Sequence, residues 1–299
     1  MRPREFPETY ATNPRSMLGA MFDYFILRPF AHGRNRATEQ QLDALYSETS
    51  TRSVEAARTK LLKLVDRFDG HLPIDPRLRY LDLGCGSGEL TLALAGLGAE
   101  NVTGVDFLRR NIQRAKACAA QAGCERVQFV CADVYEWIPE RRYDVLLSFD
   151  ALEHIDAPAA FLRKMADFIA PGGVAVLAFG PLFHSPFGDH MWDFFRVQIP
   201  WRGVLFSERA VLRLRRECYR PTDPAQSYSS VAGGLNLIRY SDFLKQVREA
   251  GWTFEYLRVN TFLRHSPLRF ISDCIMRVPG LRDYFVHNVY AVLKSKARP

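Results

Sequence analysis

The chain has 299 residues, of which 47% are hydrophobic, and a formal net charge of +7. This length is long for one compact domain and short for two independent ones, and the apolar fraction allows a full-sized core. The longest apolar run near the start, residues 17–27, is interrupted by Asp23. This run is too short to cross a bilayer, which excludes a transmembrane segment there.

Cysteine usage and the first residues indicate the cellular compartment. The start of the chain is acidic as well as basic and no small-residue cleavage site follows the apolar run, so we expect no secretory signal. The six cysteines, at positions 85, 118, 124, 131, 218 and 274, show no CxxC pair and no other metal-ligand spacing. Buried free thiols are the favoured state. We therefore expect a reducing, cytoplasmic location.

Charge is unevenly distributed along the chain. Residues 80–180 hold 9 Lys and Arg against 13 Asp and Glu, a balance of −4. The remainder holds 31 against 20, a balance of +11. A basic surface of this kind can face nucleic acid, an anionic substrate, membrane phosphate or only solvent. The charge balance by itself leaves these alternatives open.

Two helices are expected at the start of the chain, each with its large apolar residues on one face. These residues are Met17, Leu18, Met21, Phe22 and Phe25 in the first helix, and Ala57, Leu61, Leu64, Val65 and Phe68 in the second. The sequence PIDP at 73–76 marks the end of this region. Residues 1–77 are therefore expected to form a helical extension that acts as a lid.

From Arg79 onward short apolar strands alternate with helical segments. The expected strands cover residues 79–84, 101–106, 126–133, 143–149 and 172–179. Helices are expected after the first, second and fourth strands, and a short helix after the third. Runs that are apolar at nearly every position are typical of strands buried on both faces. The pattern predicts an α/β fold with a doubly wound, mostly parallel sheet and a core in residues 78–180.

The alternation lapses after Phe179. Residues 181–238 are expected to be an insertion that forms a lid over a substrate. Beyond it we expect a helix at 240–250, a strand at 252–259 and a last strand within 286–295, with a second insertion at 261–285 between the two strands. Residues 239–299 would thus complete a seven-stranded, Rossmann-like sheet.

The strongest motif is YLDLGCGSGEL at 80–90, which places Gly84, Gly86 and Gly88 between a strand and a helix. Glycine allows a sharp turn and lets a ligand approach the backbone closely. The residue after Gly88 is Glu89, so the GxGxxG dinucleotide fingerprint is not met, and the loop lacks the lysine of a P-loop. A pyrophosphate ligand therefore fits this loop poorly.

Two aspartates end the next two strands. Asp106 comes 18 residues after Gly88, where a carboxylate can accept both ribose hydroxyls of an adenosine. Asp133 ends the third strand, where a carboxylate can accept a hydrogen bond from the adenine amino group. Either residue alone would more often be a helix cap. Three successive strand ends, each with the appropriate residue, favour an adenosine site.

These motifs resemble the class I S-adenosylmethionine-dependent methyltransferases, particularly the small-molecule enzymes related to ubiquinone biosynthesis and the methyltransferase type 11 domain. The matching stretches are DLGCGSG (82–88), VD (105–106), AD (132–133), YDVLLSFDALEHI (143–155) and APGG (170–173). The resemblance covers roughly residues 78–180. It implies S-adenosylmethionine as the cofactor and a reversed seventh strand, and it is nearly silent about the acceptor.

The resemblance also implies a cofactor-binding role for residues at the strand ends. They are Asp82, Leu83, Gly84, Cys85, Gly86, Gly88, Asp106, Phe107, Asp133, Val134, Phe149 and Asp150. Asp82 and the glycine loop would face the methionine part of the cofactor, and Asp106 the ribose. The adenine would lie between Phe107 and Val134, with Asp133 at its amino group. The end of the fourth strand would close the methionine side.

Transfer of a methyl group to an alcohol or phenol needs a base, and histidine is suited near neutral pH, whereas an amine or carboxylate acceptor may be methylated without one. His154 follows the fourth strand in DALEHI, where it could act as the base or serve the architecture of the loop. His184 and His190 lie in GPLFHSPFGDH at 180–190, as candidate bases, polar pocket walls or plain loop residues. With Asp189 they also offer metal-type ligands. Their spacing matches no standard site, so we predict no metal.

Aromatic and basic residues mark the two insertions. The aromatic residues between positions 181 and 201 are Phe183, Phe187, Trp192, Phe194, Phe195 and Trp201. They favour a lid over an aromatic or lipid-like acceptor, or a small satellite core. Arg213, Arg215 and Arg216, with the basic stretch 261–299, could meet an anionic substrate or membrane phosphate. Residues 267–285 mix apolar and arginine side chains as an interfacial element does.

The sequence as a whole predicts an S-adenosylmethionine-dependent methyltransferase acting on a small molecule, with oxygen as the methylated atom and an anionic or amphipathic acceptor. A nucleic-acid methyltransferase is favoured only by charge, because SFDALEH at the end of the fourth strand lacks the Pro-Pro-aromatic signature. A non-catalytic partner subunit is disfavoured by the intact glycine and aspartate positions. Peripheral membrane contact and the oligomeric state stay open.

Overall fold

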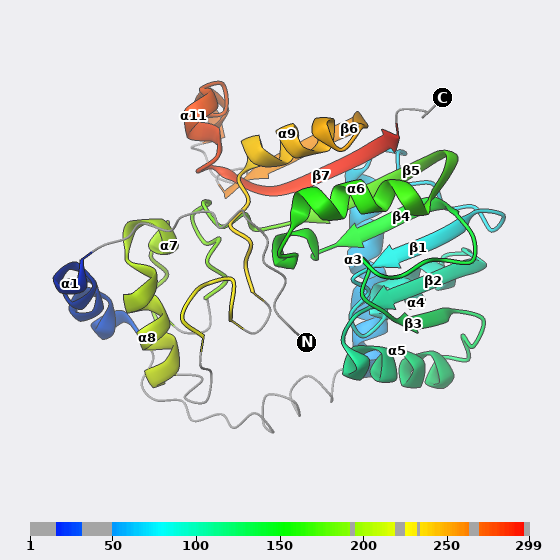
Figure 1. Ribbon diagram of the computed structural model, residues 1–299, viewed down its shortest axis with the longest axis horizontal. Coiled ribbons are helices and arrows are strands. Elements are labelled where there is room, and N and C mark those ends of the chain that lie inside the picture. Colours follow the sequence, from blue (N-terminus) through cyan, green and yellow to red (C-terminus); the bar gives the residue numbers. More distant parts are fainter. Residues whose placement is uncertain are drawn as a thin grey trace.

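The computed structural model describes residues 16–31, 50–191, 195–218, 225–231, 234–262 and 269–295. A seven-stranded sheet forms its centre, with the strand order β3-β2-β1-β4-β5-β7-β6 (Figure 1). The strands are β1 (Arg79–Leu83), β2 (Asn101–Asp106), β3 (Gln128–Cys131), β4 (Tyr143–Phe149), β5 (Ile169–Phe179), β6 (Trp252–Thr261) and β7 (Val286–Ser295).

Strands β1 to β5 are parallel, whereas β7 runs antiparallel to both of its neighbours, β5 and β6. This confirms the predicted doubly wound, mostly parallel sheet and its reversed last strand. The direction of the winding changes at β1, which lies between β2 and β4. Ligands of open α/β sheets bind outside the carboxyl ends of the strands at such a switch point.

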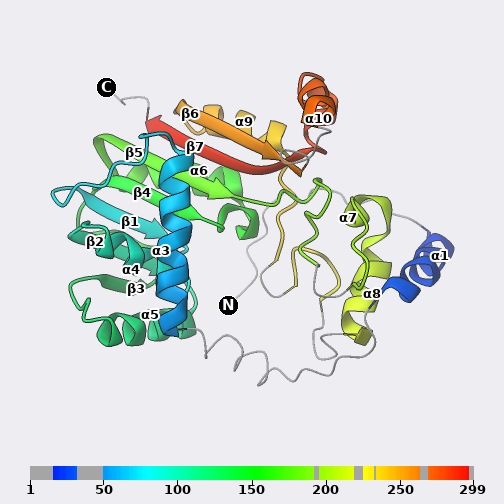
Figure 2. The same ribbon diagram turned by 180° about the vertical axis from the view of Figure 1, so that it is seen from behind.

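Helices cover both faces of the sheet. They are α1 (Met17–Leu27), α3 (Ser50–Arg67), α4 (Glu89–Gly96), α5 (Arg109–Gln121), α6 (Pro158–Phe168), α7 (Arg202–Leu205), α8 (Glu208–Cys218), α9 (Tyr240–Glu249), α10 (Arg269–Ile275) and α11 (Pro279–Arg282), with the short helices η1 (Arg28–Phe30) and η2 (Leu152–His154). Helices α6 and α9 lie on one face (Figure 1) and α3 on the opposite face (Figure 2). Buried side chains of α3, α4 and α5 form one core cluster with the sheet, and those of α6 and α9 form the second.

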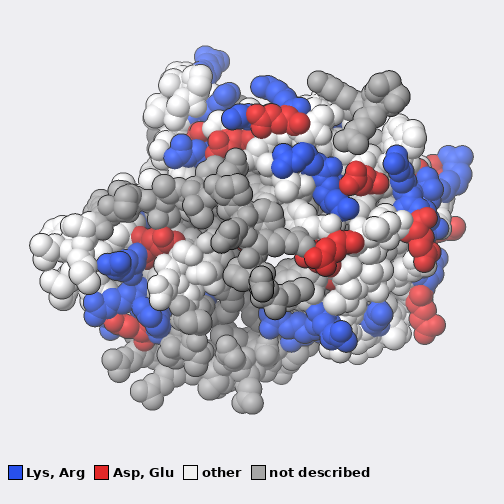
Figure 3. All heavy atoms as spheres, viewed as in Figure 1, with Lys and Arg blue, Asp and Glu red and all other residues white. Residues whose placement is uncertain are grey.

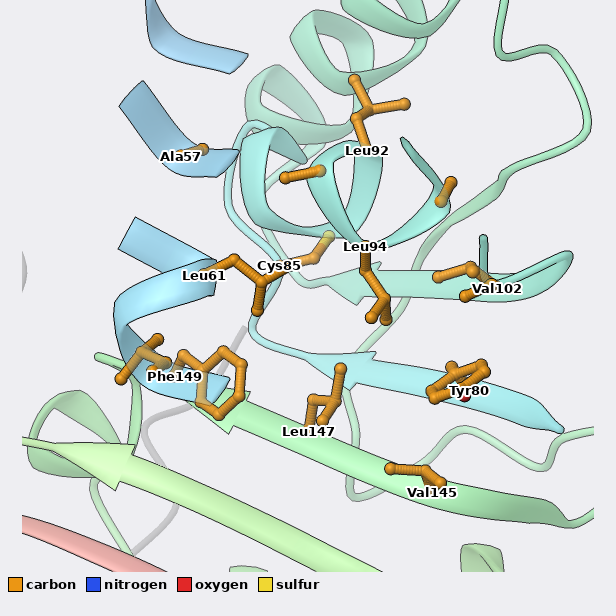
Figure 4. Packing of buried hydrophobic residues seen from close by; sticks show 14 of the residues in the cluster. Ala57, Leu61, Tyr80, Cys85, Leu92, Leu94, Val102, Val145, Leu147 and Phe149 are labelled. Carbon is orange, nitrogen blue, oxygen red and sulfur yellow. The ribbon is translucent and has the colours of Figure 1, made fainter. Parts of the chain in front are cut away.

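Helix α3 joins the N-terminal part of the chain to the core. Its predicted apolar face is buried at Ala57, Leu61, Leu64 and Phe68, and Val65 packs against the same cluster. Leu61 lies between the glycine loop at Cys85 and the end of β4 at Phe149 (Figure 4). The helix therefore covers the carboxyl edge of the sheet beside the motif that the sequence singled out.

Among the differences between the predicted and observed elements, two concern the segment after β3 and the start of β5. The short helix expected after the third strand is absent: residues 134–136 make a single turn, in which Glu136 N and Trp137 N donate to Asp133 O. Pro139 accounts for this, because proline disfavours the helical conformation of the residue before it and donates no hydrogen bond. Ile169, expected in the preceding helix, begins β5 instead.

The insertion at 181–238 contains two helices, α7 and α8, that the sequence analysis did not predict. Together with α1 it lies beyond the carboxyl ends of the parallel strands (Figures 1 and 2). Its apolar side chains form a third buried cluster, which includes Leu27 and Ala31 from the start of the chain, Phe183, Met191, Phe195, Val211, Leu214 and Tyr228. The expected satellite core is therefore present; Trp192 and Phe194 fall outside the described residues.

A buried ion pair holds this insertion together. The Arg202 Nε and Nη2 atoms donate to the Asp189 carboxylate at 2.7 and 2.9 Å, and both side chains are almost fully buried. The guanidinium also lies 3.8 Å from the ring centroid of Phe195. Removal of one partner from such a pair typically costs about 3–5 kcal/mol, because the other charge is left buried alone. Asp189 is thus committed to Arg202.

Among the described residues, no helix combines the length and the apolar composition that crossing a bilayer requires.

Candidate functional site

The carboxyl ends of five adjacent parallel strands form one edge of the sheet. Because the strand order is β3-β2-β1-β4-β5, this edge carries Asp133, Asp106, the glycine loop, Asp150 and Gly180 in that order. Neighbouring strands lie about 4.8 Å apart. The edge therefore offers a line of polar groups long enough for an extended ligand.

The glycine loop has positive φ angles, which residues with a side chain rarely adopt. Gly88 has φ +80°, and a Cβ there would lie 2.7 Å from the Phe129 ring, so glycine is required by packing. Gly86 has φ +55°, yet a Cβ there would meet no atom within 4 Å. The positive φ accounts for glycine at this position, and the open space beside it lets a ligand approach the backbone.

Asp106 is tied to the same loop. One carboxylate oxygen accepts a hydrogen bond from Gly86 N at 3.0 Å, and the other accepts from Leu108 N at 2.8 Å and from Asn111 Nδ2 at 3.1 Å. The residue thus supports the start of α5, as the helix-cap alternative proposed, and it also fixes the glycine loop. A carboxylate has about four acceptor sites, so one site stays open for a ligand hydroxyl, and a second hydroxyl would take the place of the Asn111 donor.

The residues beyond β2 and β3 provide an exposed aromatic surface. Phe107 is 71% exposed although it directly follows the buried Asp106. Val134 is half-buried, and Asp133 accepts a hydrogen bond from Tyr135 N at 2.9 Å. A large apolar ring exposed beside a polar edge is a feature that a planar base could cover.

Asp82 lies buried beneath the glycine loop. Thr91 Oγ1 donates to its carboxylate at 2.6 Å. Burial raises the pKa of Asp82 to about 6, the Thr91 hydrogen bond opposes this, and the negative charge of Asp106 adds to it. A cationic ligand group near this carboxylate would favour its ionised form. Burial likewise raises the pKa of the neighbouring Cys85 thiol, which therefore stays protonated.

The end of β4 contains an ion pair that the sequence analysis did not predict. Lys60 of α3 donates to the carboxylate of Asp150, and both side chains are half-exposed. Phe149 is buried, and its ring stacks with Phe68, which directly follows α3, at a centroid distance of 6.3 Å. Helix α3 thus contributes the positive charge of Lys60 to the site edge.

Two of the three candidate histidines meet beyond β4 and β5. The rings of His154 and His190 pack edge to face with centroids 5.4 Å apart. His154 Nδ1 lies 2.8 Å from Gly234 O, and His190 Nε2 lies 2.9 Å from Pro181 O. Because carbonyl oxygens only accept, these nitrogens carry the protons, so that Nε2 is the accepting atom of His154. Burial lowers the pKa of His190.

Glu153, next to His154 in the DALEHI motif, is buried beside this pair. The sequence alone did not indicate a role for it. Gly180 N donates to its Oε1 at 3.0 Å, and Oε2 is buried without a hydrogen-bond partner. Burial holds the pKa of Glu153 well above its ordinary value, while the charge of His154 acts against this shift. The carboxyl group therefore links the turn after β4 to the start of the lid insertion.

His184 is separate from the pair. Its ring packs edge to face against Phe183 and Tyr284, with centroids 5.4 and 5.9 Å away. Burial lowers its pKa to about 4. No group of three or more His, Cys, Asp or Glu side chains within the described ranges could hold a metal ion. His184, Asp189 and His190 thus have three different sets of partners.

Comparison with known proteins finds methyltransferases. A family model described as a methyltransferase domain matches residues 74–180, the segment that contains β1 to β5 and the whole site edge. This segment is therefore similar to methyltransferase domains, and the relatives found by sequence carry methyltransferase names. Its resemblance to the small-molecule members, proposed from the motifs alone, is confirmed.

Two curated relatives are methyltransferases of small molecules. The chain is 32% identical over 162 residues to the 27-O-demethylrifamycin SV methyltransferase of Amycolatopsis mediterranei (strain S699), a match that covers 54% of this chain and 58% of that protein. It is 38% identical over 101 residues to the ubiquinone biosynthesis O-methyltransferase of Bradyrhizobium sp. (strain ORS 278), covering 34% and 39% respectively. The chain therefore spans less than two thirds of the length of either relative.

A solved structure resembles the chain over nearly its whole length. The [4+2]-cyclase SpnF has a TM-score of 0.51 and 17% sequence identity, and the match covers 96% of this chain and 98% of that one. At this identity the likeness shows the fold alone. Because one fold can support different reactions, the activity of this protein must be argued from its site.

The residues at the site edge fit the cofactor that the family name implies. Gly86 leaves open space where a side chain would stand, Phe107 presents an exposed ring, and Asp82 is a buried carboxylate whose pKa no cation among the described residues lowers. S-adenosylmethionine has a planar base, a ribose with two hydroxyls and a methionine ammonium. Each of these parts has a complementary group along the edge.

Proposed function

We propose that this protein transfers a methyl group from S-adenosylmethionine to an oxygen atom of a small molecule. The observation that carries the proposal is the order of groups along the sheet edge. From β3 to β5 they run from Asp133 through Asp106 and the glycine loop to Asp150 and then to the pair His154 and His190. This is the order of adenine, ribose, methionine and acceptor in an extended complex.

Each cofactor-binding residue has a proposed task. Asp106 would accept the ribose hydroxyls, and Asp133 the adenine amino group, while the adenine ring lies against Phe107 and Val134. Asp82 and the loop from Leu83 to Gly88 would hold the methionine part. The backbone at Phe149 and Asp150 would close that side, with Lys60 positioning the Asp150 carboxylate. These interactions orient the methyl group toward the acceptor.

The bound cofactor supplies an electrophilic methyl group on a sulfonium, which is already a good leaving group. The protein then has to align the acceptor, exclude water and remove a proton from a hydroxyl. His154 is suited to the last task, because Gly234 O holds Nδ1–H and leaves Nε2 to accept the proton. His190 packs against its ring and would keep it oriented.

An aromatic or lipid-like acceptor is supported by the lid insertion and by the printed activities of the relatives. The satellite cluster behind His190 contains Phe183 and Phe195, and such a wall strengthens water exclusion. A nucleic-acid substrate has no comparable support, since the two curated relatives act on rifamycin and ubiquinone precursors by name. The free thiols of all six cysteines support a cytoplasmic location.

The proposed activity is tested by a methyl-transfer screen. Purified protein, tritiated S-adenosylmethionine and candidate phenols, quinone precursors, sugars and lipids are incubated together, and products are identified by mass spectrometry. We expect labelled product with a hydroxyl-bearing acceptor, with a mass increase of one methyl group. Binding of the cofactor without transfer to any acceptor class would contradict the enzymatic role and favour a partner subunit.

The affinity for S-adenosylmethionine is expected to fall as the pH is lowered through 6. Burial raises the pKa of Asp82 to about 6 in the free protein, and a bound ammonium group would lower it again. Binding therefore releases a proton below this pH, at a cost of up to about tenfold in affinity per pH unit. Calorimetric titrations between about pH 5 and 8 measure the effect.

Asp82→Asn is the control for this pH dependence, because an asparagine can still accept from Thr91 but cannot titrate. We expect weaker binding that varies little across the same range. An unchanged slope in the variant would assign the proton to another group.

A further inference from the structure

Helix α1 docks on α8 through polar contacts. The buried Asp23 carboxylate accepts a hydrogen bond from Ser207 N, just before α8, at 2.8 Å. The Tyr24 hydroxyl donates to Glu217 of α8 at 2.6 Å. Of the helix itself, Ala20, Asp23 and Leu27 are buried against this partner. The attachment of α1 thus uses few of its large apolar residues.

The opposite face of α1 is apolar and exposed. It consists of Met17, Leu18, Met21, Phe22 and Phe25, whose exposed fractions lie between 50% and 78%. A surface helix of a globular protein ordinarily turns its apolar face to the core. A contiguous exposed apolar patch marks an interaction site. The helical face predicted from the sequence therefore forms, but it points away from the fold.

Basic residues border this face. The exposed side chains of α8 include Arg209, Arg213 and Arg216, spaced so that they share one side of the helix. The Arg213 guanidinium lies 4.1 Å from the ring centroid of Tyr24, and its Nε donates to Glu217 at 2.8 Å. Arg213 therefore connects α8 to α1, and the charge offered to a partner comes from Arg209 and Arg216. Figure 3 shows the uncharged surface of α1 at the left with Lys and Arg atoms beside it. An apolar helical face beside arginines is the composition of an interfacial helix.

We propose that α1 and the arginine side of α8 form a docking surface for an anionic lipid bilayer. The helix has 11 residues and would be about 16 Å long, so it would lie in the plane of the interface. Its apolar side chains would enter the boundary between headgroups and acyl chains, and the arginines would meet lipid phosphates. Both halves of the surface would then be satisfied by one partner.

The same charges disfavour a second copy of the chain. A two-fold dimer through this surface would bring the arginine sides of two α8 helices together, and like charges at an interface are repulsive. The docking surface also shares a buried cluster with Phe183 and Met191 of the lid insertion. Docking would therefore bring the lid toward the bilayer. The inference rests on α1 and α8 and does not require methyl transfer.

Vesicle co-sedimentation of the full chain tests the docking surface. The probes are vesicles of phosphatidylcholine alone and of phosphatidylcholine with an equal part of phosphatidylglycerol. We expect binding to the anionic vesicles that weakens with salt, and at least tenfold weaker binding in Phe22→Ser/Phe25→Ser and in Arg209→Glu/Arg216→Glu. Ile138→Ser, which changes an 84% exposed apolar residue of the core domain, and Arg110→Glu are matched controls expected to bind as wild type.

Several outcomes would overturn the proposal. Absence of vesicle binding, equal losses in the control variants, or a loss confined to Phe270→Ser on α10 would each remove α1 from the interface. Sedimentation velocity that shows an oligomer dissociated by Phe22→Ser/Phe25→Ser would mean that a second copy covers the face. Binding that appears only after deletion of residues 1–15 would assign the face to that segment. Cofactor titration of every variant shows separately whether the site edge is intact.

Discussion

Asp106→Ala is expected to weaken binding of S-adenosylmethionine at least a hundredfold in a calorimetric titration. Two ribose hydroxyls that donate to a carboxylate would contribute about 1.5–3 kcal/mol each, which corresponds to a loss of roughly 10²–10⁴ in affinity. The substitution also removes the acceptor of Gly86 N and of Leu108 N, so the glycine loop loses its anchor. Both consequences weaken binding of the cofactor.

Asn111→Ala is the control for this variant. It removes one donor to the Asp106 carboxylate, whose distance is 3.1 Å, and leaves in place the proposed ribose contact and the bonds from Gly86 N and Leu108 N. We expect less than about a fivefold loss of affinity, because the groups that would contact the cofactor are unchanged. Thermal unfolding of both variants reports any loss of the fold. Wild-type affinity in a folded Asp106→Ala protein would refute the proposed ribose contact.

His154→Ala is expected to lower turnover with a hydroxyl acceptor by about 10²–10⁴, the usual contribution of a general base. The cofactor affinity should stay within a few-fold of wild type, because His154 lies beyond the end of β4 and not at the glycine loop. Steady-state rates with a hydroxyl acceptor and calorimetric titrations of the cofactor measure the two effects separately.

Two further histidine variants serve as comparisons. His190→Ala removes the ring that packs against His154 and should lower turnover less than His154→Ala, by an effect on orientation. His184→Ala should lower the melting temperature more than turnover, because its ring packs between Phe183 of the lid and Tyr284, just before β7. Full activity of His154→Ala would mean that another group removes the hydroxyl proton or that the acceptor needs no base.

Much of the fold follows from local patterns. The apolar runs and glycine turns identify β1 to β5, since strands buried on both faces must be apolar at nearly every position. The glycine loop, Asp106 and Asp133 could be placed on one edge because parallel strands end at the same side of a sheet. The expected helix after β3 was wrong because Pro139 acts more strongly than the weak helical periodicity around it.

Helix α8 shows a signal that was available in the sequence. Its buried residues Val211, Leu212 and Leu214 have helical spacing, and Arg213 and Arg216 occupy the other side. The arginines indicate a charged surface, and they make the helical periodicity of the apolar residues less evident. The limits of the lid and of the other segments proposed from the sequence stay predictions.

The sequence by itself determined the sheet, its winding and the edge on which the candidate cofactor residues stand, because these depend on periodicity and on residues close together in the chain. Tertiary structure decided which distant residues meet. Lys60 forms an ion pair with Asp150, and the ring of His154 packs against His190 and not against His184. Arg202 binds the Asp189 carboxylate, which is therefore not available as a metal ligand. Such pairings join residues far apart in sequence, so only the packing of α3 and the lid insertion on the sheet selects among them. The same holds for α1, whose apolar face was predicted from the sequence. The hydrogen bonds of Asp23 and Tyr24 to the segment around α8 orient the helix so that this face is exposed.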